Sequence, residues 1–311
     1  MPAALLLHGQ RGMGKNLLAR SLARSILCEA PRGMGRACGN CSACRLMDAG
    51  THPDYRELLP GAEDSALREG GEIAPARKPG VQIPVSAVRE LADLSVMSSH
   101  RGRGRVALIS PAESLHSSAA NALLKILEEP PPGMHFLLVS HEPQRLLPTV
   151  ISRCFRLPVA RPAPEVAVRH LATADRARAE LALALSGYAP IAAGDLIADQ
   201  EFWTLRAEFF SEFWRRGSDP LELASRAEAF DPAMLARLLL MACHDLLAGK
   251  HELPARYHLD YQGEIRARGA VLSAASIAGW VDRILQYARS AYHPLNRRLA
   301  LEALFAALPE T

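Results

Sequence analysis

The sequence predicts an α/β domain with a parallel sheet, followed by a segment built from helices alone. Three short apolar strands, expected at residues 3–7, 106–109 and 136–140, alternate with helical patterns, as in chains that form βαβ units. The first strand leads through a glycine-rich loop into an amphipathic helix, which is the context of a phosphate-binding loop. From residue 202 onward the only hydrophobic period is helical.

The glycine-rich loop reads Gly-Gln-Arg-Gly-Met-Gly-Lys and ends at Lys15. Gly9, Gly12 and Gly14 would let backbone N–H groups turn toward an anionic oxygen. Lys15 would reach the outer phosphates of a nucleotide. A working loop continues with Ser or Thr, whose hydroxyl ligates Mg²⁺, whereas this chain continues with Asn16. An amide is a different and longer ligand, so this degenerate loop lacks its usual Mg²⁺ ligand. ATP binding is therefore doubtful.

Length and composition are those of a globular protein with more than one core. The chain has 311 residues, of which 49% are apolar, and its mean hydropathy is zero, which predicts two or three domains. A net charge of +3 is too small to imply nucleic-acid binding by itself. No window approaches the roughly 18 uninterrupted apolar residues of a membrane span. The first residues lack the basic leader of a signal peptide, and six cysteines are too few for a disulfide scaffold, so we expect a cytoplasmic location.

Four of the six cysteines lie within 17 residues, at Cys28, Cys38, Cys41 and Cys44. Four thiolates joined by short loops predict a closed, structural Zn²⁺ site, whose binding energy would fold an insertion with almost no core. A chance cluster of free thiols is the alternative. His52 precedes Pro53, so we expect it in a turn rather than as a further ligand.

Three segments resemble a known family. They are the cysteine run that continues to Asp54 and Tyr55, a helical string that ends in Leu-Glu-Glu-Pro at residues 127–130, and Ser152-Arg153-Cys154. In these segments the chain resembles the clamp-loader subunits of bacterial DNA polymerase III, which are AAA+ proteins, and within them the delta-prime family. The resemblance implies an AAA+ phosphate-loop domain with a parallel sheet and a zinc-binding insertion, a small helical lid, and an all-helical collar.

The boundaries of these domains follow from composition and from the resemblance. A run of prolines after residue 157 marks the end of the first domain. We therefore expect the phosphate-loop domain at 1–160, with its zinc module at 28–44. The helical lid would occupy 161–201, and the collar that joins subunits into a ring would occupy 202–311.

Other positions that ATP chemistry requires also lack their usual residue. The second predicted strand should end in Asp-Glu, which hold Mg²⁺ and polarise the attacking water, but it ends in Ser110-Pro111. Glu113 lies close by, and we expect it to stabilise a helix start instead. The resemblance places a phosphate sensor at Ser140, although a strand-end serine also suits a turn. It places an arginine sensor where this chain has Ile191, so we expect no ATP hydrolysis.

Arg153 is the residue to which the resemblance assigns catalysis. In that family the arginine of Ser-Arg-Cys faces a neighbouring subunit, where a guanidinium can stabilise the phosphoryl group being transferred. A surface salt bridge is the alternative. Cys154 beside it is expected to be a small buried side chain rather than a zinc ligand or a nucleophile.

The resemblance implies a non-hydrolysing, stationary subunit of the clamp loader, itself part of a DNA-directed DNA polymerase holoenzyme. Its partners would be the tau/gamma motor and delta subunits and, through the complex, primed DNA and the sliding clamp, with no membrane. Family members carry a segment before the first strand that helps to hold the adenine. This chain begins at that strand, so we expect either a truncated start or an open nucleotide pocket.

Two other functions are consistent with parts of the sequence. The first is an ATP-hydrolysing motor subunit, which the loop up to Lys15 favours and which Asn16, Ser110, Pro111 and Ile191 oppose. The second is a stand-alone, zinc-dependent DNA-binding module, which the weak net charge opposes.

Three further segments have simpler interpretations. Residues 56–80 are rich in Pro, Gly and charge, so we expect a surface loop, followed by a helix over 85–97. The run Arg101-Gly-Arg103-Gly-Arg105 is either a solvated turn or a contact for a phosphate backbone. The three tryptophans are expected in the core, because no basic and aromatic pattern surrounds them.

Overall fold

A computed structural model describes residues 2–60, 82–96, 99–171, 173–215, 217–290 and 296–308. The chain divides into two compact units, Met1–Ala160 and Arg161–Thr311. The further division expected at residue 201 stays a prediction. Most of the surface loop expected at 56–80 lies outside the described residues.

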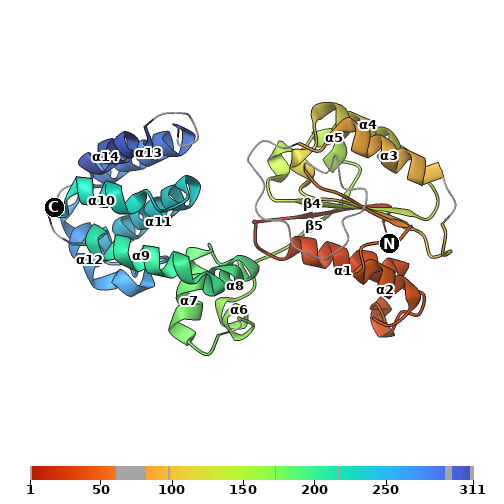
Figure 1. Cartoon of the computed structure of the whole chain (residues 1–311), viewed down its shortest axis with the longest axis horizontal. Helices are drawn as coiled ribbons and strands as arrows, with labels where there is room; N and C mark the ends of the chain where they lie inside the picture. Colours follow the sequence, from red (N-terminus) through yellow and green to blue (C-terminus); the bar gives the residue numbers. More distant parts are fainter. Residues whose placement is uncertain are drawn as a thin grey trace. The chain divides into compact units, whose positions relative to one another are not determined.

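The first unit is built on a five-stranded sheet in the order β2-β3-β4-β1-β5 (Figure 1). Every neighbouring pair is parallel. The strands are β1 Ala4–His8, β2 Tyr55–Leu58, β3 Arg105–Ile109, β4 Met134–Ser140 and β5 Phe155–Pro158. The predicted parallel sheet and its three apolar strands are confirmed. The sequence did not reveal β5, because this edge strand is short, exposed and ends in a proline that indicated a domain boundary.

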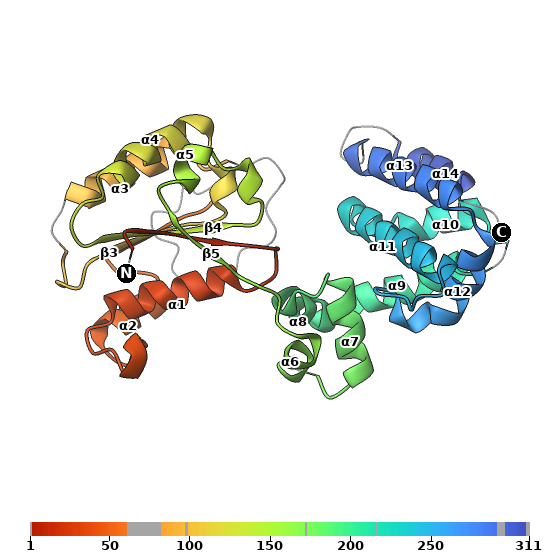
Figure 2. The same ribbon diagram turned by 180° about the vertical axis from the view of Figure 1, so that it is seen from behind.

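Helices cover both faces of the sheet. Alternate residues of the central strands pack on α1 Lys15–Leu27 on one face, as Leu7 packs with Ala23. The residues between them, such as Leu6, join a second core with α3 Val85–Val96 and α4 Ser117–Glu128. Figures 1 and 2 show α1 on one side of the sheet and α3, α4 and α5 Pro148–Ile151 on the other. Burial on both faces explains why these strands are continuous apolar runs.

Short elements follow the carboxyl ends of α1 and β3. After α1 the chain forms a 3-10 turn at Gly33–Gly35 and then α2 Ser42–Asp48. A second 3-10 turn, Ala112–Ser114, follows β3. The cysteine insertion and the residues after β3 are therefore both held next to the sheet.

The second unit consists of helices. They are α6 Pro164–Arg169, α7 Arg176–Leu185, α8 Pro190–Ala198, α9 Gln200–Phe213, α10 Pro220–Ala227, α11 Pro232–Lys250, α12 Gln262–Val271, α13 Ala274–Ser290 and α14 Arg297–Ala306. Several begin with an Asp or Asn whose side chain accepts a backbone N–H, as Asp231 does for Met234 at the start of α11.

Aromatic side chains form the centre of this second unit. Phe213 stacks on Trp280, with ring centroids 5.8 Å apart, and packs edge-on to Trp214 at 4.8 Å. Trp214 and Trp280 are buried, whereas Trp203 is half-buried beneath Arg178. The interpretation of the tryptophans as core residues is thus confirmed for the first two, and Trp203 packs against the edge of the same core.

Helix α11 is long and apolar enough to cross a membrane by length and composition alone. Half of that apolar stretch is buried inside the protein, and its Leu238, Leu239 and Ala242 belong to the core of the second unit. Burial against neighbouring helices accounts for the composition of α11 without a membrane.

Candidate functional site

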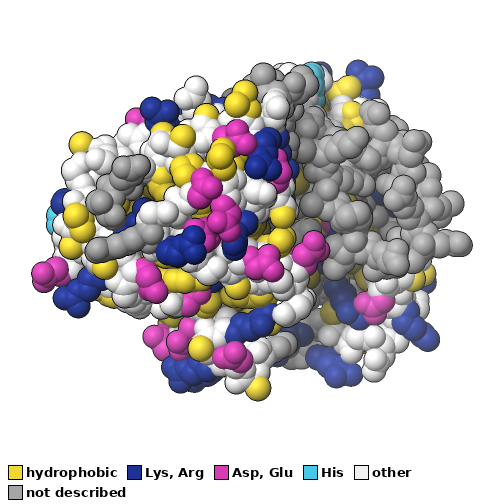
Figure 3. Space-filling model, turned by 60° about the vertical axis from the view of Figure 1, so that its left-hand side comes forward, with side chains coloured by type: hydrophobic (Ala, Val, Ile, Leu, Met, Phe, Trp, Pro, Cys, Tyr) yellow, Lys and Arg dark blue, Asp and Glu magenta, His cyan; other side chains and the backbone are white. Residues whose placement is uncertain are grey.

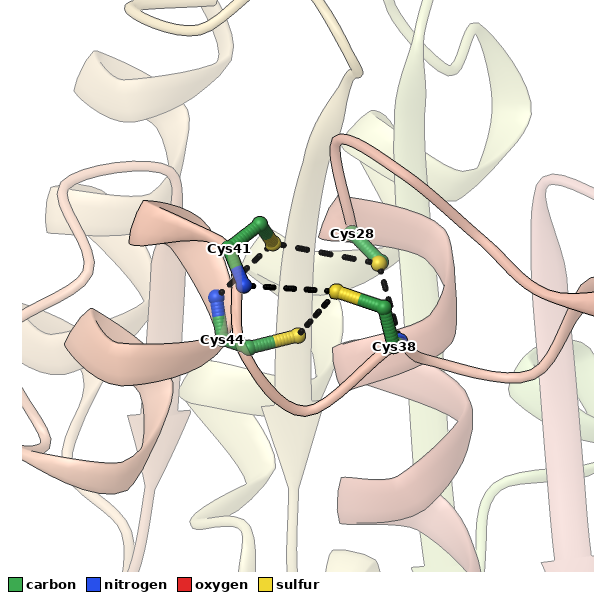
Figure 4. Close-up of side chains that lie close together, drawn as sticks. All are labelled: Cys28, Cys38, Cys41 and Cys44. Atoms are coloured by element: carbon green, nitrogen blue, oxygen red, sulfur yellow. Dashed lines mark hydrogen bonds between the residues drawn. The ribbon is translucent and has the colours of Figure 1, made fainter.

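The four clustered cysteines converge on one point. Cys28 follows the last turn of α1, and Cys44 lies in the first turn of α2. The Sγ atoms of Cys28 and Cys41 are 3.9 Å apart, those of Cys38 and Cys44 are 4.0 Å apart, and all four lie within 4.8 Å of one another. Figure 4 shows the four side chains pointing toward a common centre.

This spacing fits a tetrahedral metal. With a zinc–sulfur distance of about 2.3 Å, the edges of a tetrahedron of thiolates are about 3.8 Å. Both sulfur–sulfur distances above are within a few tenths of an ångström of that value. The donor set of four thiolates therefore fits Zn²⁺, and its four ligands leave no coordination position open for catalysis.

Backbone N–H groups also donate hydrogen bonds to the cysteine sulfurs, which favours the ionised thiolate form. Cys38 N donates to the Sγ of Cys28 at 3.2 Å, Cys41 N donates to that of Cys38 at 3.3 Å, and Cys44 N donates to that of Cys41 at 3.4 Å. Burial opposes ionisation of Cys41, but these and other backbone donors outweigh it and lower its pKa to about 6. Burial raises the pKa of Cys44 to about 11.

His52 takes no part in the cysteine cluster. It is buried, and its Nδ1 accepts the backbone N–H of Asp54 at 3.1 Å in the turn before β2. The expectation that His52 belongs to a turn is confirmed. Cys154 is half-buried against the core beneath α4, and burial raises the pKa of its thiol to about 11.

The phosphate-binding loop connects β1 to α1 in the predicted place. Gly9, Gly12 and Gly14 all have positive φ, and Gly9 also has no room for a Cβ, which would lie 2.8 Å from the carbonyl oxygen of Val159. Lys15, the first residue of α1, is buried, and its Nζ donates to the carbonyl oxygens of Gly9 at 2.7 Å and Gln10 at 2.6 Å. The loop thus surrounds its own lysine.

Residues after β3 and β4 complete the surroundings of Lys15. Burial lowers the pKa of Lys15 to about 8, the nearby charge of Glu113 opposes that shift, and Arg11 adds to it. Glu113 lies in the 3-10 turn at 112–114 rather than in the first turn of α4, and its Oε1 accepts the backbone N–H of His141 at 2.9 Å. Glu113 thus lies at the start of a helical element, as expected, but that element is the 3-10 turn, because α4 begins only at Ser117 and is capped by His116.

Several buried polar atoms around this loop lack a hydrogen-bond partner among the described residues. They are Asn16 Oδ1, Glu113 Oε2, Ser140 Oγ and His141 Nδ1. Burial and the charge of Lys15 lower the pKa of His141, which favours its neutral form. Unpartnered polar atoms of this kind are normally satisfied by water or a ligand, so this edge of the sheet is a polar region.

The signature that would make this edge of the sheet an ATPase site is missing. β3 ends at Ile109, and the next residues are Ser110 and Pro111, which supply no carboxylate. Ile191 lies exposed in the first turn of α8. Neither Glu113 nor His141 was assigned to the loop from the sequence, because 28 residues separate them and only the order of strands brings them together.

Arg153 lies just after α5, on the surface of the first unit. Its guanidinium pairs with the Oε1 of Glu128 at 2.6 Å and donates to the carbonyl oxygen of Thr149 at 3.1 Å. Both side chains of this pair are partly exposed, so their attraction is weak. Arg153 is thus held in a partly exposed ion pair at the surface.

Comparison with known proteins identifies the family. Residues 1–163 match the family model described as "DNA polymerase III, delta subunit". DNA polymerase III subunit delta' of Pseudomonas aeruginosa is 35% identical over 98% of this chain and 92% of that protein. The chain belongs to the delta-prime family of DNA polymerase III subunits. The corresponding subunit of Escherichia coli is 41% identical over 52% of this chain and 43% of its own length.

A solved structure supports the fold of this delta-prime family member. The crystal structure of a DNA polymerase III gamma subunit-related protein from Thermotoga maritima has a TM-score of 0.51 over 98% of this chain and 94% of that one, with 16% identity. The predicted α/β fold class of AAA+ clamp-loader proteins is confirmed by the parallel sheet, the family match and this likeness.

Proposed function

We propose that this chain is the stationary, non-hydrolysing subunit of a clamp-loader complex, within a cytoplasmic DNA polymerase III holoenzyme. Its partners would be the tau/gamma motor and delta subunits, with which it would help to load the sliding clamp onto primed DNA. The observation that carries this proposal is the end of β3, where Ser110 and Pro111 stand in place of the acids that activate water.

Two features of the loop support the lack of hydrolysis. The amino group of Lys15 donates to carbonyl oxygens of its own loop, and Asn16 supplies no hydroxyl for Mg²⁺. One oxygen of the nearest carboxylate, Glu113, already accepts the N–H of His141. Purified chain should therefore show no ATP turnover above a Lys15→Ala variant.

We assign Arg153 the role of an arginine finger that acts in a neighbouring subunit. Its ion pair with Glu128 is exposed, so the γ-phosphate of a neighbour's ATP could displace the carboxylate at little cost. A guanidinium placed there stabilises charge on the transferred phosphoryl group, an effect of about 10³-fold or more for arginine fingers in general.

Arg145 offers a matched control for Arg153. It lies in the segment before α5 and forms a comparable exposed pair with Glu142 at 3.4 Å. In a ring reconstituted with motor and delta subunits, Arg153→Ala should lower DNA-dependent ATP turnover by about 10³-fold. Arg145→Ala should leave turnover within about twofold. Equal effects of the two substitutions, with assembly intact by sedimentation, would remove Arg153 from catalysis.

We assign the four cysteines to a structural Zn²⁺. The tetrahedral fit of their Sγ atoms supports this metal, and four thiolates exclude a substrate water from the first coordination sphere. Zinc would close the insertion between α1 and α2, because the four ligands link the end of one helix to the start of the next.

An ATP-hydrolysing motor subunit is the second candidate, and one observation favours it. Glu113 is close enough to Lys15 to affect the pKa of its amino group, so a carboxylate does reach the loop from another element. Turnover by the purified chain that both Lys15→Ala and Glu113→Gln abolish would establish this function and exclude the stationary role.

A further inference from the structure

The insertion held by the cysteines ends in an exposed hairpin. Arg32 N donates to the carbonyl oxygen of Arg36 at 2.8 Å, and Gly35 N donates to that of Arg32 at 3.0 Å. Met34 occupies the apex with φ 61° and ψ 24°, and 96% of its surface is exposed. The left-handed region is strained for methionine, whereas a glycine would adopt it freely. The apex thus keeps an apolar side chain in solvent in a conformation that suits a smaller residue.

The hairpin is also basic. Between Ala30 and Asn40 the sequence contains two arginines, Arg32 and Arg36, and no acidic residue. Neither arginine forms an ion pair within the ranges that the structure describes, whereas Arg20, Arg24 and Arg101 do. The antiparallel bridge pairs the backbones of Arg32 and Arg36 across the hairpin, and both arginines are exposed.

A second basic segment lies beside this insertion. Glu29 follows the first cysteine and pairs with Arg101, so the turn that carries Arg101 and Arg103 is next to the cysteine module. Figures 1 and 2 both show the chain before β3 at the same end of the sheet as α2. Arg103 is exposed and has no ion pair among the described residues. Arg105, by contrast, is buried and donates to the carbonyl oxygen of Pro132, so it is inaccessible to a partner.

The position of this turn is fixed by a buried acid. Asp54 is 1% exposed and accepts hydrogen bonds from His100 N at 2.9 Å, Arg101 N at 3.1 Å and Ser99 Oγ at 3.2 Å. A carboxylate with three donors is held firmly in the interior. Asp54 therefore holds residues 99–101 of the turn in place, and the exposed Arg103 follows two residues after Arg101.

We propose that Arg32, Met34, Arg36 and Arg103 form a DNA-contacting surface, which we name the module surface. The arginines would pair with backbone phosphates, and Met34 would contact a sugar or the edge of a base. A Cβ added at Gly33 or Gly35 would meet no atom within 4 Å, so the backbone of the apex is open and can approach a nucleic acid closely. This inference rests on the proposed function, in which the complex acts on primed DNA.

The observations favour DNA over an acidic protein. A few arginines around a narrow apex are enough to contact the phosphates of a DNA backbone. A stable protein interface of standard size, by contrast, needs about 800 Å² of surface from each partner. The hairpin projects only a few side chains, of which one is apolar. Repeated phosphates on a backbone match separated arginines without requiring a large buried surface.

The test measures binding of the full chain to a fluorescently labelled primer–template duplex by anisotropy, from about 50 to about 200 mM salt. Arg32→Gln/Arg36→Gln should weaken binding about tenfold at the lowest salt and reduce the slope of log affinity against log salt by about 1.8, because two phosphate contacts are lost. Met34→Gly should weaken binding without changing that slope, since methionine carries no charge. Arg103→Gln should reduce the slope by about 0.9.

Arg266→Gln/Arg283→Gln is the matched control. Both residues are exposed in the second unit, and neither forms an ion pair among the described residues. On the face of the protein in Figure 3, basic and acidic side chains are interspersed rather than gathered by sign. The control should change DNA affinity less than about twofold. Equal losses in the control and in Arg32→Gln/Arg36→Gln would overturn the proposal, as would the absence of wild-type binding at the lowest salt.

Two further measurements separate possible causes. Zinc content should match the wild type in every variant, because the substituted side chains lie outside the metal ligands. Thermal stability should match in the arginine variants and should be no lower in Met34→Gly, where glycine relieves the left-handed strain. In the reconstituted ring, the variants should assemble normally. Loss of affinity for another subunit with unchanged DNA binding would make the module surface a protein contact and overturn the proposal. A chain that never enters the ring would contradict the proposed function, while the anisotropy of the isolated chain would still decide the DNA contact.

Discussion

The two ends of helix α1 carry the two motifs of the first unit, and they differ in how completely their chemistry is assembled. At its start, the phosphate loop has the required backbone, but Lys15 bonds to the carbonyls of its own loop, and Ser110 and Pro111 directly follow β3 where the acids would lie. At its end, Cys28 joins three other thiols at distances that suit one metal ion. A four-thiolate site draws all its ligands from one short segment, whereas a nucleotide site needs side chains from several strands. Replacement of a single residue on one of those strands can therefore disable a nucleotide site although its glycine-rich loop is still present.

The largest effect is expected at the cysteine end. Cys44→Ser removes a buried ligand, so metal content should fall from one ion to nearly none and the insertion should become sensitive to protease. Metal analysis together with limited proteolysis measures both effects. Cys154→Ser is the control, because Cys154 lies outside the cluster and should keep the full metal content. A full complement of metal in the Cys44 variant would show that the thiols do not form one site.

Gly9→Ala tests whether the loop glycine has a structural role without a nucleotide. The new Cβ would lie 2.8 Å from the carbonyl oxygen of Val159 at φ 144°, so we expect a loss of about 3 kcal/mol in the free energy of unfolding. Gly50→Ala has a positive φ but open space, and it should cost about 1 kcal/mol. Urea denaturation of both variants isolates the contact with Val159. Equal losses would mean that this contact is relieved by a small backbone shift.

The lysine of the loop should make stability depend on pH. The pKa of Lys15 is lowered to about 8 from 10.5, so the folded state loses the proton before the unfolded state does. Burial of the charged amino group destabilises the folded state, and this effect is fully present below pH 8. It is relieved as pH rises from 8 toward 10.5, because in that range unfolding takes up a proton. Wild type should therefore gain on the order of 1 kcal/mol relative to Lys15→Met between about pH 7 and about pH 9.5. Lys125→Met, at an exposed lysine of α4, should show no such trend. A constant difference at the two pH values would contradict the buried cationic amine.

The smallest effect is expected from nucleotide. Millimolar MgATP should raise the melting temperature by no more than about 1 °C, because a ligand whose Kd exceeds its concentration stabilises little. Removal of the metal by a chelator should shift the melting curve far more. A rise of several degrees with MgATP that Lys15→Ala abolishes and Lys125→Ala does not would show that the phosphate loop binds nucleotide.

Local patterns were sufficient for much of this protein. The strand, glycine loop and helix from Ala4 to Leu27 follow from adjacent residues, and the four cysteines follow from their spacing. The helices of the second unit follow from their period and from caps such as Asp231. In each case the residues that interact lie within a few turns of one another, so the sequence contains the whole signal.

Contacts between distant segments could not be predicted. The strand order places Glu113 and His141 beside Lys15, and the ion pair with Glu29 places the arginine turn beside the cysteine module. The edge strand β5 is too short and too exposed to carry an apolar signal. The amino-acid sequence by itself determined the parallel sheet, the thiolate cluster and the lack of acids at the two positions directly after β3, because these depend on local period and residue type. Only the tertiary structure decided which charges face Lys15 and which arginines are left exposed, because those depend on how parallel strands bring remote loops to one edge of the sheet.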